Sequence, residues 1–333
     1  MNPFHFLKGW GKGPGPETIL TLIVPASYTA YSWDEEVVRL YGRHTRIHRL
    51  NPADCRHFQR LRYDGDLLFV GTGHHLPGLF DTDEKISFWR SQPGRKYLYQ
   101  FERTIDDLWG TGIELERRAI LIDPTCCAVQ DEQDALAYEK TFGLPAIWLP
   151  DMISRRRVAL GRQNPPLRKR PVDVLFVGKT AGEWYAPRRA ALEEVRRICA
   201  AQGLRMKIID TSERRVKDSE ILALFREARI VLNPIGAGAF FNIRFFEALA
   251  AGCVCLQQTT REGAILERFA DRYRNYAACH FRTVTEIGPA IEDVISRLPE
   301  WEKIARDTFD LLERNDTAEA RFATLGIPFP APL

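Results

Sequence analysis

Short apolar runs alternate along the chain with longer segments whose apolar residues recur every three or four positions. The runs lie at 18–24, 66–70, 96–101, 126–129 and 146–149 in the first half, and at 172–177, 206–209, 230–232 and 254–257 in the second half. Strand-like runs that alternate with helical segments are typical of parallel sheets with crossover helices. The pattern therefore predicts an α/β fold.

Several of the expected helices carry residues that favour a start or a stop. The segment 131–142 opens with acidic residues and ends at Gly143, and a later helix has Pro187 in its first turn and Gly203 at its end. A long final helix is expected at about 300–325, with a possible break near Asn315.

The chain of 333 residues is long enough for two domains with separate cores. Between them we expect a linker at 161–171, because Pro165 and Pro166 cannot continue a helix or a strand there. The expected domains are an N-terminal one over 17–165 and a C-terminal one over 171–305.

Composition narrows the class of protein. With 45% hydrophobic and 27% charged residues, the chain resembles an ordinary enzyme and differs from disordered and collagen-like chains. Residues 1–16 lack the apolar core of a secretion signal, and the run 19–24 is too short to span a bilayer. The seven cysteines show no metal-ligand spacing, which favours reduced thiols. We therefore expect a cytoplasmic protein.

A net charge of +3 does not by itself indicate a polyanionic partner, but one segment is strongly basic. Its cations are Arg155, Arg156, Arg157, Arg162, Arg168, Lys169 and Arg170, with no acidic residue among them. A solvated linker is the favoured interpretation. The alternative is a track for a phosphate-rich acceptor such as DNA or an anionic lipid headgroup, although no aromatic residue interrupts the cluster.

The densest chemical signal is a glycine-rich loop between a strand and a helix. Gly236 and Gly238 allow the backbone to approach a ligand, and the helix that follows offers free N–H groups, which suits a diphosphate. Arg244 and Glu247 share one face of that helix. An arginine clamps phosphate oxygens, and a carboxylate accepts the vicinal hydroxyls of a ribose. The alternative is a tight turn beside a surface ion pair.

Longer stretches of the second half carry a family resemblance. The stretches are 174–179, Arg188-Arg189, 224–234 and 242–252, with Asp316, Thr317 and Arg321 near the end. They resemble the donor domain of GT-B glycosyltransferases of the group 1 type, and in particular the spore-maturation (CgeB-like) branch. The resemblance implies two Rossmann-like domains facing across a cleft, with the acceptor side first. It also implies that a helix over 306–325 returns to the N-terminal domain.

The resemblance assigns the donor to residues of the second domain. They are Gly178, Lys179, Arg188, Arg189, Gly236, Gly238, Asn242, Arg244 and Glu247. By this assignment Glu247 holds the ribose, the loop from Gly236 to Asn242 holds the diphosphate, and Lys179 with the two arginines supplies positive charge. Solvated first-turn residues are the alternative for Arg188 and Arg189. Retaining members carry a glutamate where this chain has Ala239, so the stereochemical outcome stays open.

In the first half, polar residues follow the predicted strands. His74 and His75 come after the run 66–70, and Glu102 comes after the run 96–101, so both lie where clefts form in parallel sheets. His75 is a candidate for sugar contact or proton transfer, and Glu102 is a candidate base for an inverting reaction. Surface or loop partners are the alternative for each. The residues Ser27, Tyr28 and Thr29 could line the acceptor side.

The sequence Asp81-Thr82-Asp83 matches the metal-binding DxD pattern superficially. In that pattern the motif ends an apolar strand, whereas here it leads into 84–89, a helical segment. A helix cap followed by first-turn acids is therefore the favoured interpretation, and no metal site is expected.

These observations predict a metal-independent, hexosyltransferase-type glycosyltransferase. It would move a sugar from a nucleoside-diphosphate sugar to an unidentified hydroxyl, with the sugar nucleotide as co-substrate and no cofactor. The alternatives are a nucleotide-sugar epimerase of the same architecture, a DNA- or lipid-directed transferase, and a non-catalytic sugar-nucleotide-binding protein.

Overall fold

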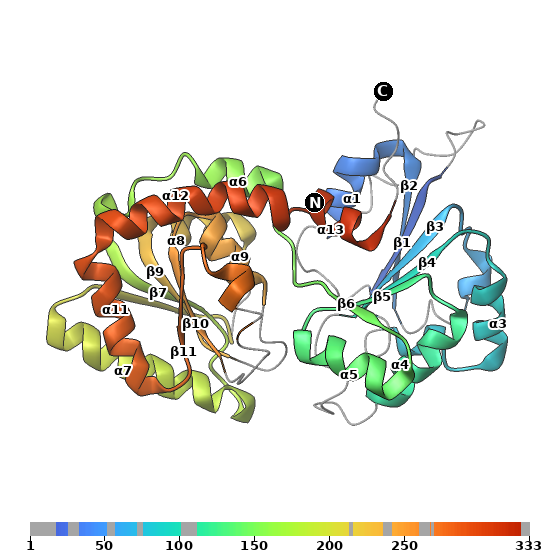
Figure 1. The fold of residues 1–333 in the computed structure, drawn as a ribbon, viewed down its shortest axis with the longest axis horizontal. Helices are drawn as coiled ribbons and strands as arrows, with labels where there is room; N and C mark the ends of the chain where they lie inside the picture. The colour runs from blue at the N-terminus through green and yellow to red at the C-terminus, as the bar shows by residue number, and fades with distance from the viewer. Residues whose placement is uncertain are drawn as a thin grey trace.

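The computed structural model describes residues 18–25, 33–51, 57–71, 76–100, 112–212, 216–235, 242–259, 267 and 270–327. These residues form two parallel sheets, each with helices packed around it (Figure 1). The expected α/β class is confirmed. Within the described ranges, no helix is both long and apolar enough to cross a bilayer.

The first sheet has six parallel strands in the order β2-β1-β3-β4-β5-β6. The strands are β1 (Leu20–Pro25), β2 (Thr45–Leu50), β3 (Asp66–Val70), β4 (Lys96–Gln100), β5 (Cys126–Val129) and β6 (Ala146–Trp148). Its helices are α1 (Trp33–Tyr41), α3 (Asp83–Ser91), α4 (Gly112–Ala119) and α5 (Glu132–Phe142). From β1 the chain goes to β2 on one side and then to β3 on the other, so the strand order reverses at β1.

The second sheet has five parallel strands in the order β11-β10-β9-β7-β8. The strands are β7 (Val172–Gly178), β8 (Met206–Asp210), β9 (Ala228–Asn233), β10 (Val254–Gln258) and β11 (Ala278–Phe281). The helices are α6 (Arg155–Gly161), α7 (Ala186–Gln202), α8 (Asp218–Glu227), α9 (Ile243–Ala250), α11 (Ile287–Ser296) and α12 (Leu298–Asn315). Here the order reverses at β7, which lies between β8 and β9.

The chain crosses between the domains at two neighbouring places. One crossing follows β6, and the other lies between α12 and the last helix, α13 (Ala318–Leu325). Ile153 N donates to Asp316 O at 2.9 Å and Ile153 pairs with Thr317 in a parallel bridge, so the crossings lie side by side. α12 runs along the second domain, while α13 packs into the core of the first (Figure 1).

All nine strands expected from the apolar runs are present, with ends that shift by at most two residues. Two strands were not expected, β2 and β11, and both lie at an edge of a sheet. Most of their side chains are half-buried, because an edge strand has a neighbour on one side only. Their mixed sequences, such as Thr-Arg-Ile-His-Arg-Leu in β2, therefore lack the apolar run that marks a central strand.

The segment expected as a solvated linker is instead packed against the second domain. Its first part forms α6, and Gly161 lies so close to α9 that an added Cβ would be 1.7 Å from Ala250 O. Further along, the buried guanidinium of Arg170 donates to Ala228 O at 2.8 Å and to Ala251 O at 3.0 Å. Pro165 and Pro166 do end the helix, but these side-chain hydrogen bonds fix the chain that follows.

Candidate functional site

The reversal of strand order at β7 brings two loops together at the carboxyl edge of the second sheet. Gly178 and Lys179 end or follow β7, and Pro234 follows β9, its neighbour. In open parallel sheets, ligands bind in the crevice at such a reversal. We call this place the β7–β9 edge.

Arg188 joins the two loops of the β7–β9 edge. From the first turn of α7 its guanidinium donates to Lys179 O at 2.8 Å and to Pro234 O at 3.2 Å. The side chain lies against the rings of Phe176 and Tyr185. Burial lowers the pKa of Arg188 below its usual value, and the nearby charge of Arg244 lowers it further. The buried Nε of Arg188 has no hydrogen-bond partner among the described residues.

The loop after β7 is held by residues at the end of β8. Ser212 Oγ accepts from Thr180 N at 3.0 Å and from Ala181 N at 2.9 Å, and Asp210 binds the Thr180 hydroxyl. Arg189 donates to Thr180 O and to Gly182 O, each at 2.7 Å, so it braces this loop from outside. The exposed Lys179 makes no ion pair with the described residues.

The start of α9 carries the predicted Arg244 and Glu247 together. Asn242 is the N-cap of this helix, and its Oδ1 accepts from Arg244 N at 3.0 Å. The Glu247 side chain is fully buried, and its Oε2 accepts from Arg244 Nη1 at 2.5 Å. Its other oxygen, Oε1, accepts from Arg157 of α6. The predicted face shared by Arg244 and Glu247 is confirmed, but the ion pair is buried and has a third member.

Buried amide side chains join the carboxyl ends of β9 and β10. Asn233 Nδ2 donates to Gln257 Oε1 at 2.6 Å, and Gln258 Oε1 accepts from Ile235 N at 3.0 Å. All three amide side chains are buried. Because each bond fixes one end of β9 or β10, the chain enters the loop that begins at 236 from a fixed position.

Several predicted residues lie outside the described part of the chain. They are His74, His75, Glu102, Ser27, Tyr28, Thr29, Gly236, Gly238 and Ala239. Their roles stay predictions. In the first sheet the strand order reverses at β1, which lies between β2 and β3.

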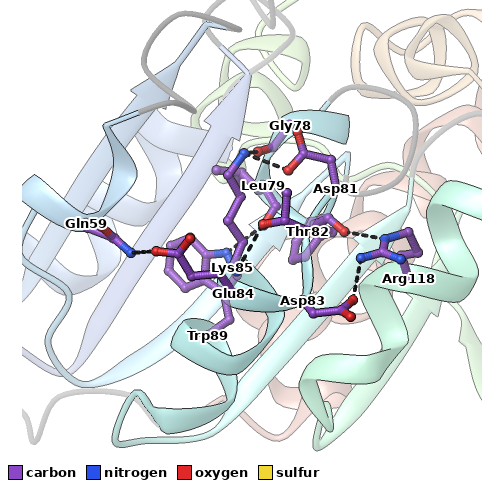
Figure 2. Close-up of polar contacts among 11 residues, drawn as sticks. Gln59, Gly78, Leu79, Asp81, Thr82, Asp83, Glu84, Lys85, Trp89 and Arg118 are labelled. Atoms are coloured by element: carbon purple, nitrogen blue, oxygen red, sulfur yellow. Dashed lines mark hydrogen bonds and ion pairs between the residues drawn. The ribbon is translucent and has the colours of Figure 1, made fainter.

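The acidic cluster of the first half caps a helix, as favoured above (Figure 2). Thr82 is the N-cap of α3, and its side chain accepts from Lys85 N at 3.3 Å. Asp81 pairs with Lys85 at 2.6 Å, and Asp83 pairs with Arg118 at 2.9 Å. The two carboxylates therefore face different cations. Among the described residues, no group of three potential ligands could hold a metal ion.

Polar residues at the carboxyl edge of the first sheet were missed by the sequence prediction. Gln130 follows β5 and donates to Asp151 Oδ2 at 2.6 Å, at the first crossing between the domains. Burial raises the pKa of Asp151 to about 7; Arg321 opposes this and Glu247 adds to it. Nearby, the Arg272 guanidinium stacks on Trp148, at 4.7 Å from the ring centre. For Gln130 and Asp151, a position within three residues of the end of β5 or β6 was the available signal.

A cavity of about 620 Å³ lies elsewhere, between α6, α8 and the end of α9. Its lining includes Leu160, Leu222, Arg226 and Ala251, with Arg157 at its boundary. It is therefore separate from the carboxyl edge of the sheet, and it meets the Glu247 cluster only through Arg157.

Comparison with known proteins supports the assignment of the second domain. Residues 181–325 match a family described as "Glycosyl transferase-like". The match covers α7, α9 and the return to the first domain, but it does not distinguish the spore-maturation branch, which stays a prediction. No protein of curated function matches the chain in sequence.

Solved glycosyltransferase structures share the whole fold. The superposition on Anabaena HepE in complex with UDP-glucose covers 92% of this chain and 98% of the HepE chain, with 9% sequence identity and a TM-score of 0.55. A glycosyltransferase from Rickettsia africae has 10% identity, coverage of 92% and 97%, and a TM-score of 0.57. An α-glucosyltransferase in complex with UDP and a 13-mer DNA has 9% identity, coverage of 93% and 98%, and a TM-score of 0.53. The expected GT-B architecture is confirmed.

Proposed function

We propose that this protein is a metal-independent glycosyltransferase that moves a hexose-type sugar from a nucleoside-diphosphate sugar to a hydroxyl acceptor. One observation carries the proposal: the buried guanidinium of Arg188 bridges the two loops of the β7–β9 edge, and its pKa is lowered by burial and by the charge of Arg244, in the first turn of α9. Arg244 is paired with Glu247, whereas Arg188 donates to backbone carbonyls and makes no ion pair with the described residues. A diphosphate at the start of α9 would supply an anion for Arg188.

The residues of the second domain divide the work of donor binding. Arg188, Arg244 and Lys179 would neutralise the charge that develops as the nucleoside diphosphate leaves, which is the task that a divalent cation performs in other transferases. Gly236 and Gly238 would let backbone N–H groups approach the phosphates, and Glu247 would accept the ribose hydroxyls. Asn242, Gly178 and Arg189 would act by fixing the surrounding backbone, because the first caps α9 and the last braces the loop after β7.

The acceptor would bind at the carboxyl edge of the first sheet, which supplies His75 and Glu102 as candidate catalytic residues. His75 would contact the transferred sugar or take a proton, and Glu102 would act as the base of an inverting reaction. Closure of the two domains would bring acceptor and donor together.

A DNA acceptor has one observation in its favour, the structural neighbour that was solved with UDP and DNA. The basic segment gives it little support. Arg157 pairs with Glu247, Arg162 with Asp310, and Arg168 with Glu302. Side chains that hold the protein together in this way are not available as a track for phosphates.

Thermal-shift measurements with UDP, GDP, ADP, CDP and dTDP test the donor site, because a ligand of the native state raises its stability by mass action. Neighbours solved with UDP make that nucleotide the first choice. Product analysis with the matching sugar nucleotides, with and without EDTA, then separates the alternatives. Transfer or donor hydrolysis that survives EDTA supports the proposal. An epimerised donor, binding without turnover, or activity restored only by Mn²⁺ would each contradict it.

A further inference from the structure

The carboxylate of Glu247 has two arginine partners that come from different elements. Arg244 lies on the same helix, three residues earlier, and binds Oε2. Arg157 lies on α6 and binds Oε1. The Glu247 side chain has no exposed surface, so an arginine takes the place of water at each of its two oxygens.

The Arg244 side chain could also bind a phosphate group at the β7–β9 edge. It lies in the first turn of α9, and its charge is felt by Arg188 at the β7–β9 edge. A diphosphate bound there would attract Arg244, since phosphate oxygens accept two parallel hydrogen bonds from a guanidinium. Turning toward the phosphates would release Oε2 of Glu247.

The backbone that carries Arg157, in contrast, is held close to α9. Ser154 is the N-cap of α6 and accepts from Arg157 N at 3.1 Å. One turn later, Gly161 lies against Ala250 O, so α6 and α9 are held at a distance that admits no side chain. The backbone of Arg157 therefore stays within reach of Glu247 when Arg244 changes partner.

We propose that Arg157 is a positioning residue for donor recognition: it holds the Glu247 carboxylate aimed at the ribose when Arg244 turns from Glu247 to the diphosphate. This inference rests on the proposed function, since it assumes a nucleoside diphosphate at the β7–β9 edge. It assigns the two arginines different roles, with Arg244 exchanging partners on binding and Arg157 remaining in contact with Oε1.

The test compares the binding of UDP with that of 2′,3′-dideoxy-UDP by calorimetry in the parent protein, Arg157→Met and Arg157→Lys. Arg157→Met keeps much of the side-chain volume but loses the charge. We expect it to reduce the preference for the ribonucleotide about tenfold. Arg157→Lys restores a cation and should recover part of this preference. Arg162→Met is the matched control, because Arg162 directly follows α6 and pairs with exposed Asp310.

The outcomes separate this inference from the proposed function. If the parent protein binds none of the nucleoside diphosphates, both the proposed function and this inference are wrong. If the parent prefers UDP to 2′,3′-dideoxy-UDP and Arg157→Met shows the same preference, only this inference is wrong. If Arg157→Met fails to fold, Arg157→Gln takes its place as the uncharged variant. A preference for UDP that falls in Arg157→Gln but not in Arg157→Lys supports the positioning role, and an equal preference in the two variants overturns it.

Discussion

Two carboxylates lie near the crossing between the domains, and their surroundings differ in charge. Glu247 is bound by two guanidinium groups. Asp151 accepts an amide N–H from Gln130, and its burial raises its pKa to about 7. The first carboxylate is therefore paired with two cations, whereas the second takes up a proton near neutral pH. Replacing the carboxylate by the corresponding amide should therefore lower the free energy of unfolding at Glu247 and raise it at Asp151.

Replacing Glu247 by Gln removes the anion from between Arg157 and Arg244. Breaking a buried ion pair in this way should lower the free energy of unfolding by about 3 kcal/mol. Affinity for UDP should also fall, by about 1.5–3 kcal/mol, because a charge-assisted acceptor of the ribose hydroxyls is lost. Urea unfolding and calorimetry measure the two effects.

Glu227→Gln is the control for this substitution, since Glu227 pairs with Lys207 on the surface and its loss should change stability by less than about 0.5 kcal/mol. If Glu247→Gln retains the parent's preference for UDP over 2′,3′-dideoxy-UDP, then Glu247 does not hold the ribose and is a structural partner of the arginines.

Replacing Asp151 by Asn should raise stability at high pH. The carboxyl keeps its proton up to about pH 7 in the folded protein but loses it at about pH 4 in the unfolded chain. The unfolded state therefore binds fewer protons between these values, and the parent loses stability as the pH rises through this window. The asparagine side chain has no charge to lose and still accepts from Gln130. Urea unfolding at pH 5 and pH 8 should show the advantage of the variant growing with pH; a constant difference would contradict it.

At the scale of elements, the contact between α6 and α9 determines how the first crossing joins the second domain. Gly161 ends α6 and lies against Ala250 O of α9. Asn164 Nδ2 then donates to Ala251 O at 3.0 Å, the same carbonyl that Arg170 binds. The end of α9 is therefore satisfied by side chains from the crossing segment, and the two helices move as one unit.

Gly161→Ala tests this contact directly. The new methyl group would overlap Ala250 O, so the helices must separate, and we expect a loss of about 2 kcal/mol in stability. Gly288→Ala is the matched control in another helix, where the methyl group would meet only Ile198 at 3.5 Å. There the higher helix propensity of alanine should stabilise the protein by about 0.5–1 kcal/mol. Equal effects of the two substitutions in chemical denaturation would show that the α6–α9 contact is not tight.

The central strands and the glycine-bounded helices could be predicted because their signals are local. An apolar run marks a strand with neighbours on both sides, as in β3 and β7. The edge strands β2 and β11 could not be found this way, because most of their side chains are only half-buried and their sequences mix polar with apolar residues. The order of strands in each sheet could not be predicted either, because it depends on which distant segments pair with one another.

For the site, the sequence could indicate Arg188, Arg244 and Glu247, because a glycine-rich loop and a helix start mark their surroundings. It could not indicate Arg157, whose partner is ninety positions away and whose neighbours are also arginines. The interpretation of Arg155 to Arg170 as a solvated linker holds for most of its cations, which are exposed, but not for the half-buried Arg157 or the buried Arg170. A run of like charges predicts exposure, but it does not show which acids on α9 and α12 pair with the run.

At the scale of the whole molecule, several arginines of the basic segment form ion pairs with acidic residues of the same chain. Arg155 pairs with Glu319 of α13, and Arg162 and Arg168 pair with acids of α12. The segment therefore joins the crossing to both domains and leaves little positive charge for an external polyanion.

We accordingly expect weak binding of duplex DNA. In fluorescence anisotropy at physiological salt, the dissociation constant should lie in the nonspecific range of about 10⁻⁴–10⁻⁶ M. Charge reversal at the exposed Lys169 should change it little. A dissociation constant of about 10 nM would overturn this expectation and favour a DNA acceptor, if the logarithm of the affinity also falls by roughly 0.9 per log unit of salt concentration for each phosphate contacted.

The return of the chain to the first domain has a consequence for biosynthesis. Ala318, Phe322 and Leu325 of α13 fill one face of the first core, beside Tyr97 and Tyr99. During translation the first sheet leaves the ribosome early, yet this face stays uncovered until the last helix follows. Nascent domains commonly fold in the order of their synthesis. In this chain all strands of the second domain, and α12, are synthesised before α13 emerges, so the domain made first is completed last.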